Sequence, residues 1–178
     1  VLAMAAPAAA ADRPAVIELF TSQGCSSCPP ADALLGEITR SRPDIVTLSF
    51  PVDIWDYIGW KDTLAKPEYT ARQKHYAQSR GDYQVYTPQI VVDGAAHGVG
   101  SDKKQLAALV EGASAARRKI VAPMTISERN GMVVVELGAA NGDIGQGAGV
   151  WLLRVARSKS VAVGRGENRG RQLTYTNV

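Results

Sequence analysis

Two cysteines, three positions apart, are the residues of this chain whose chemistry is easiest to predict. Cys25 and Cys28 lie in the run Gly24-Cys25-Ser26-Ser27-Cys28-Pro29-Pro30. Proline is common in the first turn of a helix, so we expect the pair to lie at a helix N-terminus, where unpaired N–H groups and the helix dipole stabilise a thiolate. This placement predicts Cys25 as the attacking thiol and Cys28 as the buried thiol that resolves a mixed disulfide.

Two other interpretations of the cysteine pair stay open. A purely structural disulfide between the two would close a very short loop and add little stability. A metal site would need further ligands, and His75 and His97 have no ligand spacing to each other or to the cysteines. We therefore predict no bound metal and no cofactor.

The elements that must position the motif are predicted by hydrophobic periodicity. Strands are expected over residues 15–20, 45–50 and 89–93, with helices over 29–40, 67–80 and 101–119. The first strand, helix and strand form a unit whose default is a right-handed parallel crossover. After the third strand, Asp93-Gly94 predicts a hairpin into a short fourth strand.

The pattern changes after Ala122-Pro123, which divides the chain into two predicted regions. Strand-like runs over 132–137, 149–155 and 172–176 follow with no helical pattern between them. We predict an α/β domain over residues 13–122 and a small antiparallel β domain over 123–178, which ends in a strand-like run and is expected to be incomplete at its C-terminus.

Residues 1–12 are rich in alanine and resemble the end of a secretory signal peptide. A flexible terminus of a cytosolic protein is the alternative. The signal interpretation predicts a periplasmic or secreted protein, in a compartment where a disulfide persists.

Composition excludes several classes of protein. Apolar residues make up 46% and charged residues 21% of the 178 positions, as in ordinary globular proteins, so disorder, collagen and coiled coil are excluded. A net charge of +3 and an aromatic content of 6% do not indicate a nucleic-acid partner. No apolar run reaches the roughly 18–20 residues of a membrane span.

A CxxC that begins a helix after a strand resembles the thioredoxin fold. Thr87-Pro88, just before the third predicted strand, matches the Thr-Pro step of that fold. The resemblance implies that this proline is cis and that residue 87 faces the CxxC and pairs with an extended substrate. A trans proline at the start of a strand is the alternative. Ordinary thioredoxins have tryptophan before the first cysteine, where this chain has Gly24.

The chain is more specifically similar to a family of secreted bacterial proteins, domain of unknown function 1223. The similarity runs from residue 14 to the end and is carried by residues 18–32, 52–62, 86–89 and 164–171. It implies a fold and a location outside the cytoplasm, but no reaction.

Three further features are candidates for accessory roles. Glu18 lies seven residues before Cys25, close to where thioredoxins place a buried carboxylate, so it is either a proton acceptor for Cys28 or an exposed strand residue. Trp55 and Trp60 either wall a substrate groove or pack over the sheet. The run from Gly164 to Arg171, with three arginines, predicts either an anion site or a solvated hairpin.

Two functions remain open from the sequence. The first is an extracytoplasmic thiol–disulfide oxidoreductase that acts on protein thiols or disulfides, with an unidentified redox partner. The second is a non-enzymatic thioredoxin-like protein that binds a ligand or carries a metal. A redox titration and a metal-binding measurement distinguish the two.

Overall fold

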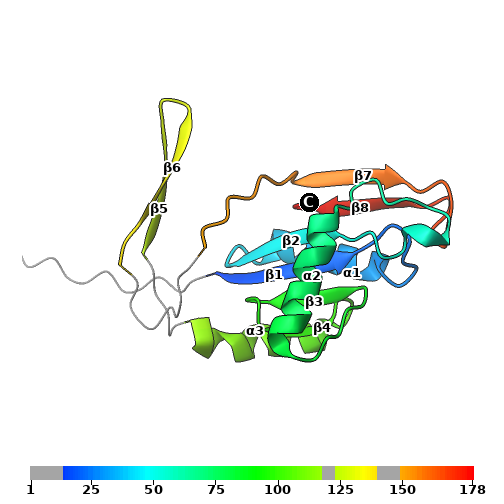
Figure 1. Cartoon of the computed structure of the whole chain (residues 1–178), viewed down its shortest axis with the longest axis horizontal. Coiled ribbons are helices and arrows are strands. Elements are labelled where there is room, and N and C mark those ends of the chain that lie inside the picture. Colours follow the sequence, from blue (N-terminus) through cyan, green and yellow to red (C-terminus); the bar gives the residue numbers. More distant parts are fainter. Residues whose placement is uncertain (1–13, 118–122, 140–148) are drawn as a thin grey trace, which may run out of the picture.

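The computed structural model describes residues 14–117, 123–139 and 149–178. Its centre is a four-stranded mixed sheet in the order β2-β1-β3-β4 (Figure 1). The strands are β1 (Ala15–Thr21), β2 (Ile45–Pro51), β3 (Gln89–Val92) and β4 (Ala96–Val99). β1 pairs parallel with β2, and β3 runs antiparallel to both β1 and β4. The parallel pairing of β1 with β2 confirms the predicted parallel unit, and the β3–β4 hairpin confirms the turn at Asp93-Gly94.

The helices lie close to their predicted ranges. They are α1 (Pro29–Ser41), α2 (Pro67–Arg80) and α3 (Lys103–Arg117), with a short 3-10 turn, η1 (Asp56–Ile58). Proline occupies the first turn of α1 and of α2, where its missing N–H costs least. α2 ends at Gly81, whose φ of 76° is a left-handed conformation that glycine adopts readily.

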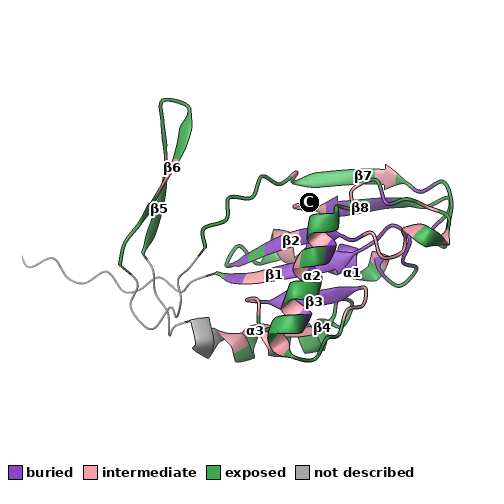
Figure 2. Cartoon of the chain, viewed as in Figure 1, coloured by how far each residue is buried: buried purple, intermediate pink, exposed green. Residues whose placement is uncertain are grey.

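Two apolar clusters fix which helix covers which face of the sheet. Because side chains alternate along a strand, Ile17 and Leu19 of β1 point to one face, where they pack with residues of α1 and α3. Phe20 points to the opposite face and packs with Phe50 and with Tyr76 of α2. The central strands are accordingly buried on both sides (Figure 2).

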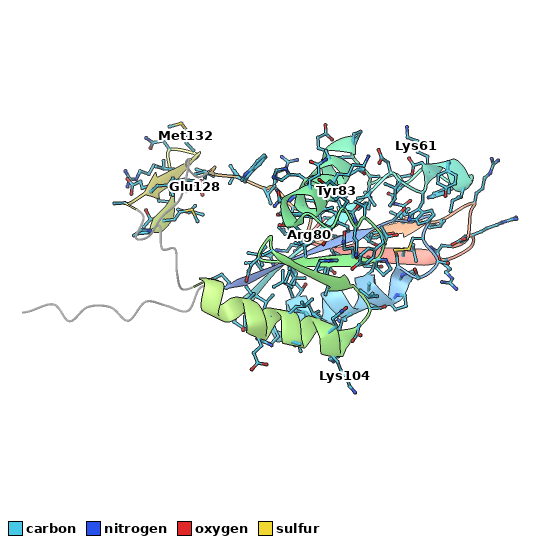
Figure 3. The ribbon with its side chains drawn as sticks, turned by 60° about the horizontal axis from the view of Figure 1, so that its bottom comes forward. Lys61, Arg80, Tyr83, Lys104, Glu128 and Met132 are labelled. Atoms are coloured by element: carbon cyan, nitrogen blue, oxygen red, sulfur yellow. A yellow bond between two sulfur atoms is a disulfide. The ribbon has the colours of Figure 1, made fainter. Side chains whose placement is uncertain are left out.

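Two hairpins follow α3 and differ in their surroundings. β5 (Met124–Arg129) and β6 (Met132–Leu137) form a hairpin that stands apart from the central sheet, with Glu128 and Met132 near its tip (Figure 3). β7 (Ser158–Ala162) and β8 (Gln172–Thr176) form a second hairpin.

The β7–β8 hairpin packs against the first half of the chain. The Ser49 N–H donates to the Asn177 carbonyl at 3.0 Å, and the Asn177 side chain donates to the Thr47 carbonyl at 3.0 Å. β8 also contacts α1. The division of the chain into two domains at residues 122 and 123 stays a prediction. β8, from the second predicted domain, packs against α1 of the first.

The strand predicted over residues 149–155 is wrong. This segment has no strand pairing within the described residues, and Trp151 and Leu152 are exposed. Pairing begins later, where Ala156 and Val178 exchange backbone hydrogen bonds of 2.7 and 3.0 Å, and continues as β7. An apolar run satisfies the local preference for a strand, but the strand forms where a partner backbone is available.

The predicted signal-peptide remnant over residues 1–12 lies outside the described residues. Among the helices of the described part, none is long and apolar enough to cross a membrane.

Candidate functional site

Cys25 and Cys28 form a disulfide at the start of α1, with their Cα atoms 5.4 Å apart. Cys28 is the residue before the helix, and its carbonyl accepts hydrogen bonds from the N–H groups of Ala31 and Asp32 at 2.9 and 3.1 Å. Both cysteines are buried: Cys25 keeps 5% of its surface exposed and Cys28 none, and their roles as attacking and resolving thiols stay predictions. The intervening Ser26 and Ser27 are exposed. The disulfide therefore lies just beneath an exposed turn.

The loop before Cys25 is held by the segment that follows β2. The Asp62 carboxylate accepts the Gln23 N–H at 2.7 Å, and Trp60 Nε1 donates to the Gln23 side-chain oxygen at 2.8 Å. Trp60 also packs against the apolar cluster of β7 and β8. Trp60 thus links the loop before Cys25 to the β7–β8 hairpin.

Trp55 connects the loop before Cys25 to Thr87, in the Thr87-Pro88 step that the sequence also predicts to be part of the site. Its Nε1 donates to the Thr87 hydroxyl at 2.7 Å. A Cβ atom placed on Gly24 would lie 3.0 Å from the Trp55 Cβ, tighter than a normal contact. Trp55 therefore takes up the space beside residue 24, which explains why this chain has glycine before its first cysteine.

The Thr87–Pro88 peptide bond is cis, which confirms that prediction. Gly100 shows how close this bond lies to α1: a Cβ atom there would lie 3.1 Å from the Cβ atoms of both Pro88 and Ala31. The Gly100 N–H donates to the Pro88 carbonyl at 3.0 Å. The cis proline and the first turn of the CxxC helix thus approach the same glycine, so the two predicted site elements lie together.

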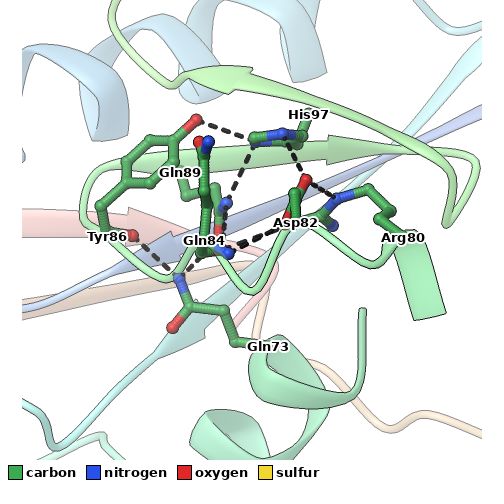
Figure 4. A network of polar contacts seen from close by, with 7 residues as sticks. All are labelled: Gln73, Arg80, Asp82, Gln84, Tyr86, Gln89 and His97. Atoms are coloured by element: carbon green, nitrogen blue, oxygen red, sulfur yellow. Dashed lines mark hydrogen bonds and ion pairs between the residues drawn. The ribbon is translucent and has the colours of Figure 1, made fainter. Parts of the chain in front are cut away.

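The loop before Pro88 is fastened to β4 by a polar network (Figure 4). Asp82 pairs with Arg80 Nε at 2.9 Å and with His97 Nε2 at 3.0 Å, and the Tyr86 hydroxyl lies 3.0 Å from His97 Nδ1. Arg80 is the main cause that holds the pKa of Asp82 at about 2. Both ring nitrogens of His97 are engaged by protein groups.

Asp32, which follows Cys28 by four residues on α1, is a buried carboxyl that the sequence analysis did not single out as a site residue. Burial raises its pKa from 3.8 to about 8; Thr21 opposes this shift and the charge of Asp62 adds to it. The Thr21 hydroxyl lies beside the carboxyl but not in good hydrogen-bonding geometry, so it offsets only part of the effect. Tyr175 of β8 lies near both carboxyls and is buried, which raises the pKa of its phenol.

Glu18 is buried rather than exposed, so the interpretation as a solvated strand residue is wrong. Arg72 donates to both of its carboxylate oxygens, at 2.6 and 2.8 Å, and the Tyr76 hydroxyl donates to one at 2.8 Å. This network lies on the face of the sheet covered by α2, whereas Cys28 begins α1 on the other face. The structure therefore does not bring Glu18 together with Cys28, and its role as a proton acceptor stays a prediction.

The β7–β8 loop, residues 163–171, lies against the turn over residues 23–28 that carries the two cysteines. Asn168 is fully buried and its side chain donates to the Gln23 and Cys25 carbonyls at 3.0 and 2.8 Å. The Glu167 carboxylate accepts the Ser26 N–H at 3.1 Å. The sequence predicts either a solvated hairpin or an anion site for this run, and its contact with the cysteine turn is a finding of the structure.

In the residues that the structure describes, no group of three or more His, Cys, Asp or Glu side chains has the arrangement of a metal site. The site instead combines a disulfide at the start of α1 with a cis proline, Pro88, beside the same helix. Two carboxyl groups flank the disulfide: Asp32 is buried one helical turn further along α1, and Glu167 is exposed and bonds the turn between the cysteines.

Comparison with known proteins gives a family and a related structure. The family model described as protein of unknown function (DUF1223) matches residues 16–178. The crystal structure of protein AGR_C_4864 from Agrobacterium tumefaciens is similar, with a TM-score of 0.75 and 34% identity over 92% of this chain and 68% of that one. No curated protein matches significantly. Because the family model covers almost the whole chain, the chain belongs to the DUF1223 family of proteins of unknown function.

Proposed function

We propose that the chain is a thiol–disulfide oxidoreductase that acts outside the cytoplasm on a thioredoxin-like scaffold. The observation that carries the proposal is the Cys25–Cys28 disulfide at the start of α1, with the cis Thr87–Pro88 bond beside the same helix. A mixed sheet with one parallel pair and helices on both faces supports the thioredoxin-like assignment. Substrates are protein thiols or disulfides, and a second redox protein restores the starting state.

The reaction begins with a substrate thiolate, which attacks the Cys25 sulfur. A mixed disulfide forms, the Cys25–Cys28 bond breaks, and Cys28 leaves as a thiolate. A second thiolate of the substrate then attacks the substrate sulfur of the mixed disulfide and releases Cys25 as a thiolate. The substrate loses two electrons, and the protein gains them as a dithiol. The same steps in reverse reduce a substrate disulfide.

Asp32 supplies the proton that Cys28 needs when it leaves. Residues four apart on a helix lie on the same face, and a carboxyl with a pKa of about 8 is mostly protonated at neutral pH in the oxidised protein. Asp32 gives its proton to the Cys28 thiolate and regains one from solvent. In the reverse direction the Asp32 carboxylate takes the proton from Cys28, as a general base.

A redox titration tests the proposal. We expect equilibration with glutathione buffers to give a two-electron couple between about −270 and −120 mV, the range of thiol–disulfide enzymes. Cys28→Ser should accumulate a mixed disulfide at Cys25 with a disulfide-bonded peptide: the Cys25 thiolate attacks the peptide disulfide, one peptide thiol leaves, and the mixed disulfide persists because the resolving thiol is missing. Cys25→Ser, the matched control, should accumulate much less. A couple below about −300 mV, typical of structural disulfides, with no mixed disulfide in Cys28→Ser, would overturn the proposal.

A further inference from the structure

An exposed carboxylate from the far end of the chain bonds the turn that carries Cys25. Glu167 accepts the Ser26 N–H at 3.1 Å, across a separation of 141 residues. The Ser26 nitrogen is bonded to the carbonyl carbon of Cys25, so the carboxylate lies one residue from the attacking cysteine. Ser26 contacts, first through its side chain and then through its N–H, hold the pKa of Glu167 below its ordinary value. Glu167 therefore stays ionised at neutral pH.

The position of Glu167 is fixed by a buried anchor next to it. Asn168 donates to the carbonyls of Gln23 and Cys25, and Arg171 Nη1 donates to the Asn168 side-chain oxygen at 3.2 Å. Asn168 has no exposed surface, although the loop around it is mostly exposed. The carboxylate of residue 167 is thus held against the turn by its neighbour.

A helix start favours a thiolate because its N–H groups and dipole offer positive potential. Glu167 acts against this effect in two ways. Its charge repels a thiolate at Cys25, since like charges a few ångströms apart disfavour each other. Its oxygen also takes up a backbone N–H in the turn that carries the cysteine.

On the basis of the proposed function, we propose that Glu167 is a positioning residue that tunes the cysteine pair, disfavouring the Cys25 thiolate and so favouring the disulfide over the dithiol. The other charged side chains of this loop are Arg165, Arg169 and Arg171, of which Arg171 donates to Asn168. Asp62 and Asp32 lie on the other side of the turn, and Asp32 is mostly neutral at pH 7. Asp62 bonds the Gln23 N–H, two residues before Cys25, whereas Glu167 bonds the N–H of the residue directly after it.

Glu167→Gln separates the charge from the hydrogen bond, because the amide oxygen can still accept the Ser26 N–H. Glu111→Gln, an exposed residue of α3, removes the same charge elsewhere and is the matched control. Two quantities are measured in each protein: the Cys25 pKa, from the pH dependence of alkylation of the reduced form, and the equilibrium constant with glutathione.

We expect the Cys25 pKa to fall in Glu167→Gln and the glutathione equilibrium to shift three- to tenfold toward the dithiol. That shift corresponds to a potential less negative by about 14–30 mV. The difference should shrink at 1 M salt, because the Debye length falls to about 3 Å, and Glu111→Gln should match the wild type. Neither measurement requires enzymatic turnover, so this inference and the proposed function can fail separately.

The inference is overturned if Glu167→Gln leaves both quantities unchanged. Glu167→Ala then gives the reason: if Glu167→Ala changes them, the hydrogen bond matters and the charge does not, and if it does not, the residue only fastens the loop.

Discussion

The buried carboxyl of Asp32 makes the stability of the protein depend on pH in a direction opposite to that of most carboxylates. When folding raises the pKa of an acid, ionisation of that acid lowers the free energy of unfolding, and the protonated acid does not. Below about pH 4, Asp32 is neutral in both states and costs nothing. As the pH rises, the unfolded chain loses this proton and the folded chain keeps it, so stability falls until the pH reaches the folded pKa of about 8.

The magnitude follows from the two pKa values. Each unit of difference corresponds to about 1.4 kcal/mol, and the pKa moves from 3.8 to about 8. The ionisable carboxyl therefore costs roughly 4 kcal/mol by pH 7 and roughly 6 kcal/mol above pH 8. Asp32→Asn removes the ionisation and keeps the shape. We expect the variant to gain stability over the wild type by these amounts between pH 4 and pH 8.

Urea unfolding of the oxidised proteins at a series of pH values measures this difference. Taking the variant minus the wild type cancels the other titrating groups, which both chains share. Asp44→Asn is a control of opposite sign, because a hydrogen bond from Arg42 lowers the pKa of that exposed carboxyl. A difference that stays flat from pH 4 to pH 9 in Asp32→Asn would refute the reasoning and remove Asp32 as a store for the Cys28 proton.

Two substitutions test the packing around the site. Asn168→Ala leaves two carbonyls of the reactive loop without their donor, so we expect a loss of about 2–4 kcal/mol in urea unfolding; a loss below about 0.5 kcal/mol would contradict the anchor. Gly100→Ala places a Cβ atom 2.7 Å from Leu19 Cδ1 and 3.1 Å from Pro88 Cβ, and we expect a loss of about 1–3 kcal/mol. Gly112→Ala, where a Cβ meets nothing within 4 Å, should instead gain up to about 1 kcal/mol, and equal effects at the two glycines would contradict the packing argument.

Local patterns were sufficient to predict the central elements. The first-turn prolines, the apolar periodicity and the Asp93-Gly94 turn each act within a few residues, and the structure confirms the helices, the parallel pair and the hairpin that they indicate. The cis bond at Pro88 was predicted through a resemblance, which rested on the CxxC, and is also confirmed. In each case the information lies in a short stretch of sequence.

The environment of the cysteines could not be predicted in the same way, because it is assembled from distant segments. Asn168 bonds the Cys25 carbonyl across 143 residues, and Tyr175 of β8 lies near Asp32. In the sequence, Asp32 is simply an acidic residue in the first turn of a helix, where exposure is the usual expectation. Its raised pKa comes from burial and from the charge of Asp62, thirty residues away in the sequence, and β8 contacts the helix that carries it.

The two carboxyls on either side of the disulfide show how burial decides what one functional group does. Asp32 is shut away from water, so its neutral form is favoured and it can hold a proton near Cys28. Glu167 is exposed and bonded by Ser26, so its ionised form is favoured and it places a negative charge near Cys25. On the proposed mechanism, the first eases the departure of Cys28 by supplying its proton, whereas the second opposes the thiolate at Cys25. Since one acts through a proton and the other through a fixed charge, changing the pH near 8 should alter the first effect and leave the second in place, and raising the salt concentration should do the reverse.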